Sequence, residues 1–192
     1  MKSKRKKTLR THSGLAAIWP AFLFGGSLPV DVPIRDAGRR MMDRFDQIRW
    51  LLRRQTTLVL ASSDEGAMPR ATPLFFVADS GLRLYWFSSR ASWHSRNCVR
   101  HPLSAITIFR DARRWQQIEG VQMEGFVAVV TDRALRRVVT HDYGARFALD
   151  KSFAGVIQRS SLYCFTPEWI RHISNAHRFG EKFELNLRSK SR

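Results

Sequence analysis

The sequence predicts a mainly β protein with flanking helices, in which short antiparallel strands form a small barrel. Runs rich in β-branched and aromatic residues recur through most of the chain after residue 55, as is typical of strands. Tight turns separate these runs, and few stretches have the apolar spacing of a helix. With 192 residues, 44% of them hydrophobic, the chain is long enough for one domain with a sizeable core.

The first 33 residues differ from the rest in composition. Six basic residues and no acid occur in the first ten positions, and an apolar segment from Gly14 to Gly26 follows, broken by Pro20. This resembles part of a signal peptide, but the apolar segment is too short to span a bilayer and no usual cleavage pattern follows. We expect residues 1–33 to be a basic, disordered extension and residues 34–192 to be the folded domain. A signal or a membrane-surface anchor is the alternative.

Charge and cysteine content limit the classes of partner. The formal charge of +17 predicts non-specific attraction to nucleic acid or anionic membranes, but it does not by itself predict a nucleic-acid function. The two cysteines, Cys98 and Cys164, form neither a disulfide framework nor a CxxC pair. This usage fits a reducing, cytoplasmic compartment.

A helix opens the folded part, and two strands follow it. Asp36 is placed to cap a helix from about Ala37 to Arg54, with a solvated basic face opposite its apolar residues, which are Met41, Met42, Phe45, Ile48, Leu51 and Leu52. Strands are expected at residues 56–62 and 70–77, with turns at 64–66 and 79–81.

The stretch from Leu82 to Pro102 is the most informative part of the chain. An aromatic strand over residues 82–87 is followed by a serine-rich turn and by a short helix from Trp93 to Arg100 that Pro102 stops. Free backbone N–H groups, serine hydroxyls and the helix dipole at such a junction favour an anion. Three side chains add donors suited to phosphate, namely Arg90, His94 and Arg96. The alternative is an ordinary capped helix with a solvated basic face.

The remaining residues continue the β pattern. Strands are expected at residues 103–109, 115–130, 161–165 and 182–187, and residues 167–174 either continue the sheet or form a turn. Gly120 and Gly125 are candidates for bulges or barrel bends in the long strand. Asp132 opens a helix, and further helical turns are expected between Tyr143 and Leu149.

The order of these blocks resembles the FMN-binding split barrel of the pyridoxamine 5′-phosphate oxidase-like superfamily, over roughly residues 49–187. The blocks that carry the resemblance are residues 58–62, 69–76, 84–89, 92–97, 101–102 and 120–125. No single block is as specific as a P-loop, but the ordered set is moderately specific. The resemblance implies a Greek-key type split β-barrel with FMN as cofactor.

The resemblance also implies roles for individual residues. Arg70 stands where the family binds the FMN phosphate, and Gln122 where a glutamine contacts the flavin ring. Trp93 and His94 replace an Arg-Lys pair of the oxidase members, and His94 can still donate to phosphate. Backbone groups of the second strand approach the flavin ring in the family, here Ala71, Thr72 and Pro73. The third strand and its turn hold the phosphate and ribityl chain, here Phe87, Ser88, Ser89 and Ser92.

The C-terminal part departs from the vitamin-B6 oxidases. Their Trp and Arg-Leu-His run, which holds the substrate phosphate, is absent from residues 167–182, so oxidation of pyridoxamine phosphate is not expected. The resemblance instead implies an FMN-dependent oxidoreductase acting on an unknown small substrate. The alternative is a module that binds a flavin, heme or nucleic acid without turnover. The six histidines show no metal spacing such as HExxH, and we interpret Cys98, four residues after His94, as a buried thiol rather than a nucleophile.

A homodimer with two flavin sites at its interface is also expected. In the superfamily, a second subunit covers the flavin ring that one split barrel leaves open. The chain has surplus apolar surface for such an interface, because four tryptophans are not easily buried in one small barrel: Trp86, Trp93, Trp115 and Trp169.

Overall fold

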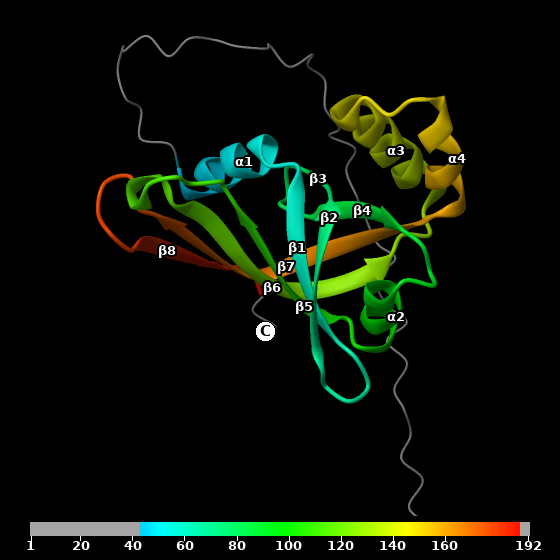
Figure 1. Ribbon diagram of the computed structural model, residues 1–192, viewed down its shortest axis with the longest axis horizontal. Helices are drawn as coiled ribbons and strands as arrows, with labels where there is room; N and C mark the ends of the chain where they lie inside the picture. The colour runs from blue at the N-terminus through cyan, green and yellow to red at the C-terminus, as the bar shows by residue number, and fades with distance from the viewer. Residues whose placement is uncertain (1–42, 189–192) are drawn as a thin grey trace, which may run out of the picture. The chain divides into compact units, whose positions relative to one another are not determined.

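The computed structural model describes residues 43–188 (Figure 1). The basic extension, the expected cap Asp36 and the expected helix start at Ala37 lie outside the described residues. Within them, the first helix begins at Arg44, and Asp43 caps it by accepting a hydrogen bond from the backbone N–H of Asp46. The helices are α1 (Arg44–Arg54), α2 (Trp93–Arg100), α3 (Arg133–Phe147) and α4 (Lys151–Arg159).

Eight strands in this part of the chain form one antiparallel sheet, which confirms the predicted fold class. They are β1 (Thr57–Ser63), β2 (Pro69–Phe75), β3 (Val77–Ala78), β4 (Leu84–Ser88), β5 (Leu103–Phe109), β6 (Glu119–Val129), β7 (Ser161–Ser174) and β8 (Glu181–Asn186). Their order is β2-β1-β5-β6-β7-β4-β3, and β8 also pairs with β7. The first half of β7 pairs with β4 and the second half with β8, while β6 follows β7 along its length. β7 therefore joins the two parts of the split barrel.

The inner face of the sheet forms the main core. Alternate residues of β1, β5 and β6 point inward and are buried, as the period of a strand requires. α1 covers one end of this core with Ile48, Leu51 and Leu52, while Phe45, expected on the same face, stays partly exposed. Arg146 of α3 holds α1 in place, because its guanidinium donates to the backbone carbonyl groups of Leu52, Arg53 and Gln55 at the end of the helix.

One of the two expected glycine irregularities is a β-bulge. The pairing of β6 with β7 shifts register between Glu124 and Gly125. A Cβ atom on Gly125 would collide with the carbonyl of Thr166 and would lie 2.9 Å from Pro167 Cα, so the two backbones approach too closely for any other residue. Gly120, in contrast, pairs in regular register with Phe109 and Ile173.

The segment before β6 differs from the prediction. Trp115, expected to begin the long strand, lies in a 3-10 turn (Trp115–Gln117), and β6 begins at Glu119. The side-chain amide of the buried Asn175 donates to the Trp115 carbonyl, and the backbone N–H of Asn175 donates to the Ile118 carbonyl. These bonds tie the turn to the end of β7 and prevent it from continuing the strand.

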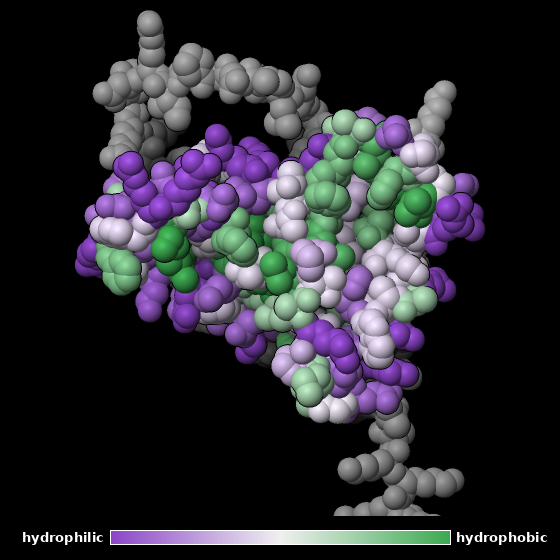
Figure 2. All heavy atoms as spheres, viewed as in Figure 1, coloured by the Kyte–Doolittle hydropathy of each residue, from purple (hydrophilic) through white to green (hydrophobic). Residues whose placement is uncertain are grey.

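α3 and α4 pack together on the face of β4 that carries Tyr85 and Phe87. The predicted helical turns extend α3 to Phe147, where Ala148 adopts a left-handed conformation, but the separate helix α4 was not predicted. Both helices cover a second core made by Val77, Tyr85, Val139, Tyr143, Ile157 and Leu162. Figure 2 shows apolar residues gathered over α3 and α4, whereas α1 presents hydrophilic ones. None of the described helices combines the length and the apolar composition that a bilayer crossing needs.

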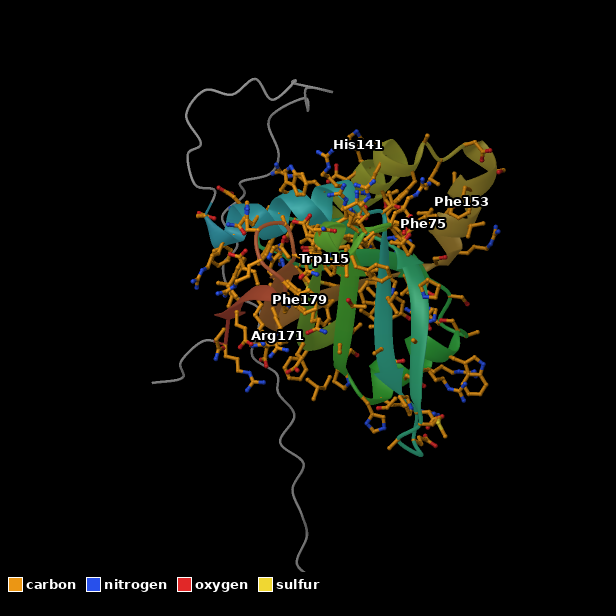
Figure 3. The ribbon with its side chains drawn as sticks, turned by 60° about the vertical axis from the view of Figure 1, so that its left-hand side comes forward. Phe75, Trp115, His141, Phe153, Arg171 and Phe179 are labelled. Atoms are coloured by element: carbon orange, nitrogen blue, oxygen red, sulfur yellow. The ribbon has the colours of Figure 1, made fainter. Side chains whose placement is uncertain are left out.

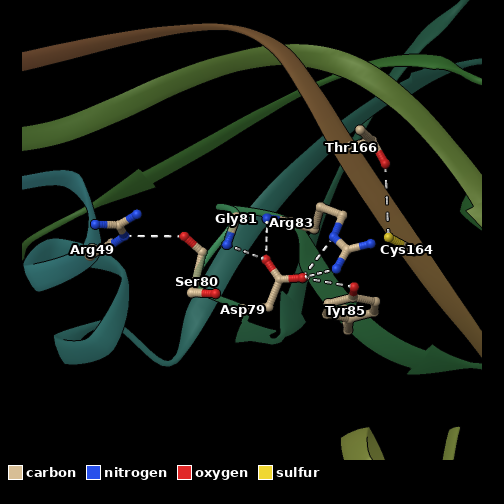
Figure 4. A network of polar contacts seen from close by, with 8 residues as sticks. All are labelled: Arg49, Asp79, Ser80, Gly81, Arg83, Tyr85, Cys164 and Thr166. Carbon is tan, nitrogen blue, oxygen red and sulfur yellow. Dashed lines mark hydrogen bonds and ion pairs between the residues drawn. The ribbon is translucent and has the colours of Figure 1, made fainter. Parts of the chain in front are cut away.

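Asp79 fixes the predicted turn between β3 and β4 (Figure 4). Its carboxylate accepts hydrogen bonds from the backbone N–H groups of Gly81 and Arg83, from the Arg83 side chain and from the Tyr85 hydroxyl. Because these bonds close the turn from within, the start of β4 is held rigidly. The strand then delivers its last residue, Ser88, to the beginning of the segment that leads to α2.

Candidate functional site

A hydroxyl–imidazole cluster, made of Ser88, Ser92 and His94, lies where β4 leads into α2. His94 Nε2 lies 2.7 Å from Ser88 Oγ and 3.1 Å from Ser92 Oγ, and the two hydroxyl oxygens are 3.2 Å apart. Ser92 is the N-cap of α2, and its Oγ accepts a hydrogen bond from the backbone N–H of Ser95. The helix bounds agree with the prediction. Three donor-capable side chains and the first turn of a helix therefore converge on one spot.

His94 brings no permanent charge to this cluster. The side chain is half-buried, and burial lowers its pKa below the usual value of 6.5. The imidazole is therefore neutral at pH 7, and it can accept from one serine hydroxyl or donate to one of them. The permanent positive charges near this cluster are those of arginines.

Arg70 supplies one such charge. Its guanidinium carbon lies 4.6 Å from the centre of the Trp93 ring, and its Nη2 lies 3.4 Å from Asp64 Oδ2. Arg96, one helical turn after Trp93, lies over the same ring at 4.7 Å. We call these three residues, Arg70, Trp93 and Arg96, the Arg–Trp–Arg clamp.

A buried hydrogen bond joins β1, the strand that pairs with β2, to α2. Arg70 pairs with Ser62 of β1, and the buried Ser62 Oγ accepts a hydrogen bond of 3.2 Å from the Asn97 side chain of α2. Sequence reasoning missed this contact, because the two residues are 35 positions apart and neither belongs to a recognisable motif. It also missed the bond of 2.8 Å from Arg90 Nε to Ser161 Oγ, which ties the serine-rich turn to β7.

The other expected residues of β2 and β4 lie in different settings. Ala71, Thr72 and Pro73 follow Arg70 on β2, which ends the sheet, so one side of its backbone has no strand partner. Ser89 is exposed, and its Oγ accepts a hydrogen bond from the backbone N–H of Ala91. Phe87 points to the opposite face of β4, where its ring meets Tyr143 edge-on at 5.2 Å.

Gln122 does not join this group within one chain. It lies exposed on the outer face of the sheet, between Thr107 of β5 and Arg171 of β7. Arg171 belongs to the half of β7 that pairs with β8, whereas β4 pairs with the other half. Gln122 is thus separated along the sheet from the cluster, and a shared role would need a second copy of the chain.

The outer face of the sheet and its far end expose large apolar side chains. On the strands these are Phe75, Leu103, Phe109 and Phe126, which are between 43% and 60% exposed. At the end that carries β8, the rings of Trp115 and Phe179, both labelled in Figure 3, contact each other edge-on with their centres 5.8 Å apart. Of the four tryptophans named above, only Trp86 is fully buried, Trp169 is half-buried, and Trp93 and Trp115 are exposed.

Two further features bear on chemistry. Cys98 is buried, as predicted, with its thiol 3.8 Å from Ser104 Oγ, and burial raises its pKa, so it is poorly suited to act as a nucleophile. It borders an apolar cavity of about 210 Å³ between α2 and β6. In residues 43–188, no group of three or more His, Cys, Asp or Glu side chains is placed to hold a metal ion.

Comparison with known proteins identifies related sequences and folds. A sequence model of the family described as pyridoxamine 5′-phosphate oxidase matches residues 45–174. No curated protein matches the chain. A conserved hypothetical protein from Mycobacterium tuberculosis is 14% identical, with a TM-score of 0.61, over 73% of this chain and 90% of that one.

Two other similar structures are named for heme. The heme storage protein HutZ from Vibrio cholerae is 22% identical, with a TM-score of 0.55, over 64% of this chain and 88% of that one. A heme binding protein from Mycobacterium smegmatis is 15% identical, with a TM-score of 0.58, over 71% of this chain and 55% of that one. At these identities the likeness concerns the fold alone.

Proposed function

Since the chain belongs to the pyridoxamine 5′-phosphate oxidase family, we propose that it binds FMN and is an FMN-dependent oxidoreductase acting on a small substrate. The observation that carries this proposal is the contact of Arg70 with Trp93, the residue that stands between Ser92 and His94 of the hydroxyl–imidazole cluster. Residues from two separate strands and a helix start come together there, and guanidinium, hydroxyl and backbone N–H groups are the donors that a phosphate requires.

The residues present fit the cofactor. Arg70, Ser88, Ser89, Ser92 and His94 would hold the phosphate and the ribityl chain. Among residues 43–188, Asp64 is the only carboxylate paired with this set. The flavin ring would lie along the exposed edge of β2, against the backbone of Ala71, Thr72 and Pro73, with Trp93 at its border. Phe87, whose ring packs on Tyr143 on the other face of β4, would contribute only backbone groups. When bound, FMN supplies hydride or electron transfer through its ring. The chain's own residues would bind and orient it.

A homodimer is part of the proposal. The exposed apolar side chains on the outer face of the sheet are suited to burial against a second copy. In such a dimer Gln122, which is remote from the cluster of its own chain, would serve the flavin of the partner. Light scattering at dilute concentration tests this, and a clean monomer that still carries FMN would rule out a shared site.

Cofactor content is the direct test of the proposed function. Purified protein, or protein incubated with FMN and desalted, should be yellow with a flavin spectrum. Dithionite or NAD(P)H should bleach it, and air should restore the colour. Protein that retains no flavin at micromolar FMN would overturn the proposal.

Heme binding is the second candidate, because two similar structures are named for it. Titration with hemin separates the candidates, since a Soret band in place of flavin retention favours a heme protein without turnover. A colourless protein whose affinity for DNA falls steeply with salt would instead favour non-specific binding of anionic polymers through its basic surface.

A further inference from the structure

Two neighbouring turns at the end of the sheet that carries β8 present large apolar side chains to solvent. Trp115 and Ile118, in the turn before β6, are 51% and 45% exposed, and Phe179, in the hairpin between β7 and β8, is 74% exposed. The rings of Trp115 and Phe179 touch edge-on (Figure 3), so the two turns form one surface. We call Trp115, Ile118 and Phe179 the apolar tip.

One buried side chain holds both turns in place. Asn175 is only 5% exposed, and its side-chain amide donates a hydrogen bond of 2.9 Å to the Trp115 carbonyl. Its backbone N–H donates to the Ile118 carbonyl, and its Oδ1 accepts a bond of 2.8 Å from the backbone N–H of Gly180, the residue after Phe179. Because both turns are tied to the same residue, the apolar tip is ordered before a partner covers it, which lowers the entropic cost of docking.

Cations surround the apolar tip. Four exposed arginines lie in the same two turns, namely Arg110, Arg113, Arg114 and Arg178. Among residues 43–188, none of them forms an ion pair with a carboxylate. Residues 110–118 and 175–181 contain two acids, Asp111 and Glu181, so the four arginines leave an excess of two positive charges. The partner of this surface should therefore be apolar at its centre and negatively charged around it.

We propose that the apolar tip docks onto an anionic membrane surface, with its three side chains at the level of the lipid headgroups and the arginines on the lipid phosphates. Exposed aromatic side chains are suited to this interface, and basic residues beside it are attracted by anionic lipids. Ile118 favours a bilayer over single-stranded nucleic acid, because an aliphatic side chain cannot stack on a base as a ring does.

The N-terminal sequence has the same combination of charge and apolar residues. Six basic residues occur in its first ten positions, and the apolar segment from Gly14 to Gly26 follows. Weak attachments to a membrane gain strength when two of them act together, so this segment and the apolar tip complement each other. The apolar tip contributes no residue to the proposed flavin site, and its docking does not depend on FMN.

Sedimentation of the full chain with vesicles tests the proposal. Trp115→Ala combined with Phe179→Ala should weaken binding to vesicles that contain phosphatidylglycerol about tenfold. Phe153→Ala combined with Val156→Ala is the matched control, since it removes two side chains of α4 that are 40% and 43% exposed, and it should change binding less than twofold. Equal binding by the wild type and the first double variant would overturn the proposal.

Paired charge variants separate the local charge from the net charge. Arg113→Gln with Arg114→Gln removes two charges beside the apolar tip, and Arg133→Gln with Arg137→Gln removes two from exposed positions of α3. The first pair should weaken vesicle binding about fivefold and the second less than twofold, since the N-terminal charges act equally in both variants. If both pairs weaken binding equally, net charge rather than this surface attracts the vesicles, and the proposal fails.

Fluorescence shows whether the apolar tip enters the bilayer. Lipids with brominated tails should quench the emission of Trp115, so Trp115→Phe, which keeps an apolar ring, should still bind but should lose this part of the quenching. Equal quenching in the wild type and Trp115→Phe would contradict docking through the apolar tip.

Two controls identify other occupants of the apolar tip. An oligothymidylate that binds more tightly than vesicles, and that the Trp115→Ala, Phe179→Ala variant no longer binds, would assign this surface to nucleic acid. A dimer that this variant converts to a monomer, as measured by light scattering, would assign it to a second copy of the chain. Either result would overturn membrane docking.

Discussion

Two of the regions that place an arginine over a tryptophan differ in charge balance. In the clamp, Trp93 lies under Arg70 and Arg96. On β7, Trp169 lies under Arg171 at 4.9 Å, but there Glu184 of β8 forms an ion pair of 2.8 Å with Arg171 and accepts a hydrogen bond from the Trp169 indole. The charge of Arg171 is neutralised by Glu184, whereas the clamp around Trp93 retains positive charge.

The difference teaches that an arginine–tryptophan contact is not by itself a sign of a binding site. The same contact is structural where a neighbouring strand supplies a carboxylate and available for a ligand where none does. The two regions can therefore be separated by experiments that change one charge at a time.

The largest expected difference follows from removing the guanidinium itself. Arg70→Ala should weaken FMN binding by about 1.5–3 kcal/mol, or roughly 10- to 150-fold, because a charge-assisted contact to phosphate is lost. Arg171→Ala should change FMN affinity less than twofold. Isothermal titration calorimetry measures both, and an unchanged affinity in Arg70→Ala would remove that residue from the site.

A smaller effect should follow from giving the clamp the carboxylate it lacks. Val99 is exposed and lies three residues after Arg96 on α2, so Val99→Glu places an acid where it can pair with that guanidinium. We expect about threefold weaker FMN binding, with Val99→Gln as the uncharged control. Equal affinities in the two variants would mean that the charge balance around Arg96 does not matter.

Acid should destabilise the two regions in different pH windows. Burial lowers the pKa of His94, so its contribution to folding is complete above pH 6.5 and is lost as the pH falls below that value. The Arg171 hydrogen bond lowers the pKa of Glu184, so that contribution is complete above pH 4.5 and is lost only at lower pH. Urea unfolding at several pH values should show both losses.

Single substitutions show which residue causes each loss of stability. His94→Gln should remove the loss that begins below pH 6.5, and Glu184→Gln should reduce the loss that begins below pH 4.5. Part of the lower loss should remain, because hydrogen bonds from Ser152 and Phe153 also lower the pKa of Asp150. A stability profile in His94→Gln that matches the wild type between pH 7 and 5 would contradict the assignment of the upper window.

The smallest effect is expected from the charge most remote in sequence. Deleting residues 1–29 removes six Lys and Arg residues and no acid. If local balance rather than net charge attracts the phosphate, FMN affinity at physiological salt should change less than twofold. A drop of tenfold would show that the extension contributes to the site or to the fold.

Much of the fold followed from local pattern. The bounds of α2 and β5 were predicted as observed, because Ser92 and Pro102 mark the helix ends and the strand alternates cleanly. The 3-10 turn at Trp115 and the helix α4 were not predicted. The buried Asn175, 60 residues later in the chain, holds Trp115 in its turn, and the left-handed Ala148 followed by the N-cap Asp150 separates α4 from α3. Tertiary contacts decided both cases.

The candidate site was predictable in its residue types but not in its charges. The serine-rich turn, His94 and Arg70 stand out in the sequence. In the structure His94 contacts Ser88 and Ser92, and Arg70 lies over Trp93, the residue before His94. The neutrality of His94 comes from burial, and the pairing of Arg96 with Trp93 and of Arg171 with Glu184 depends on neighbours that a linear pattern does not reveal. Gln122 shows the same limit, because strand register sets it apart from the cluster.

The place of β7 has a consequence for synthesis of the protein. β1, β2, β5 and β6 can pair as they leave the ribosome, but the β3–β4 hairpin has no strand to join until Ser161–Phe165 emerge. Until then the nascent chain exposes unpaired edges on β4 and β6, which invite aggregation. We therefore expect the barrel to close late, after nearly the whole chain has been made, and translation products that stop before residue 161 to depend on chaperones for their solubility.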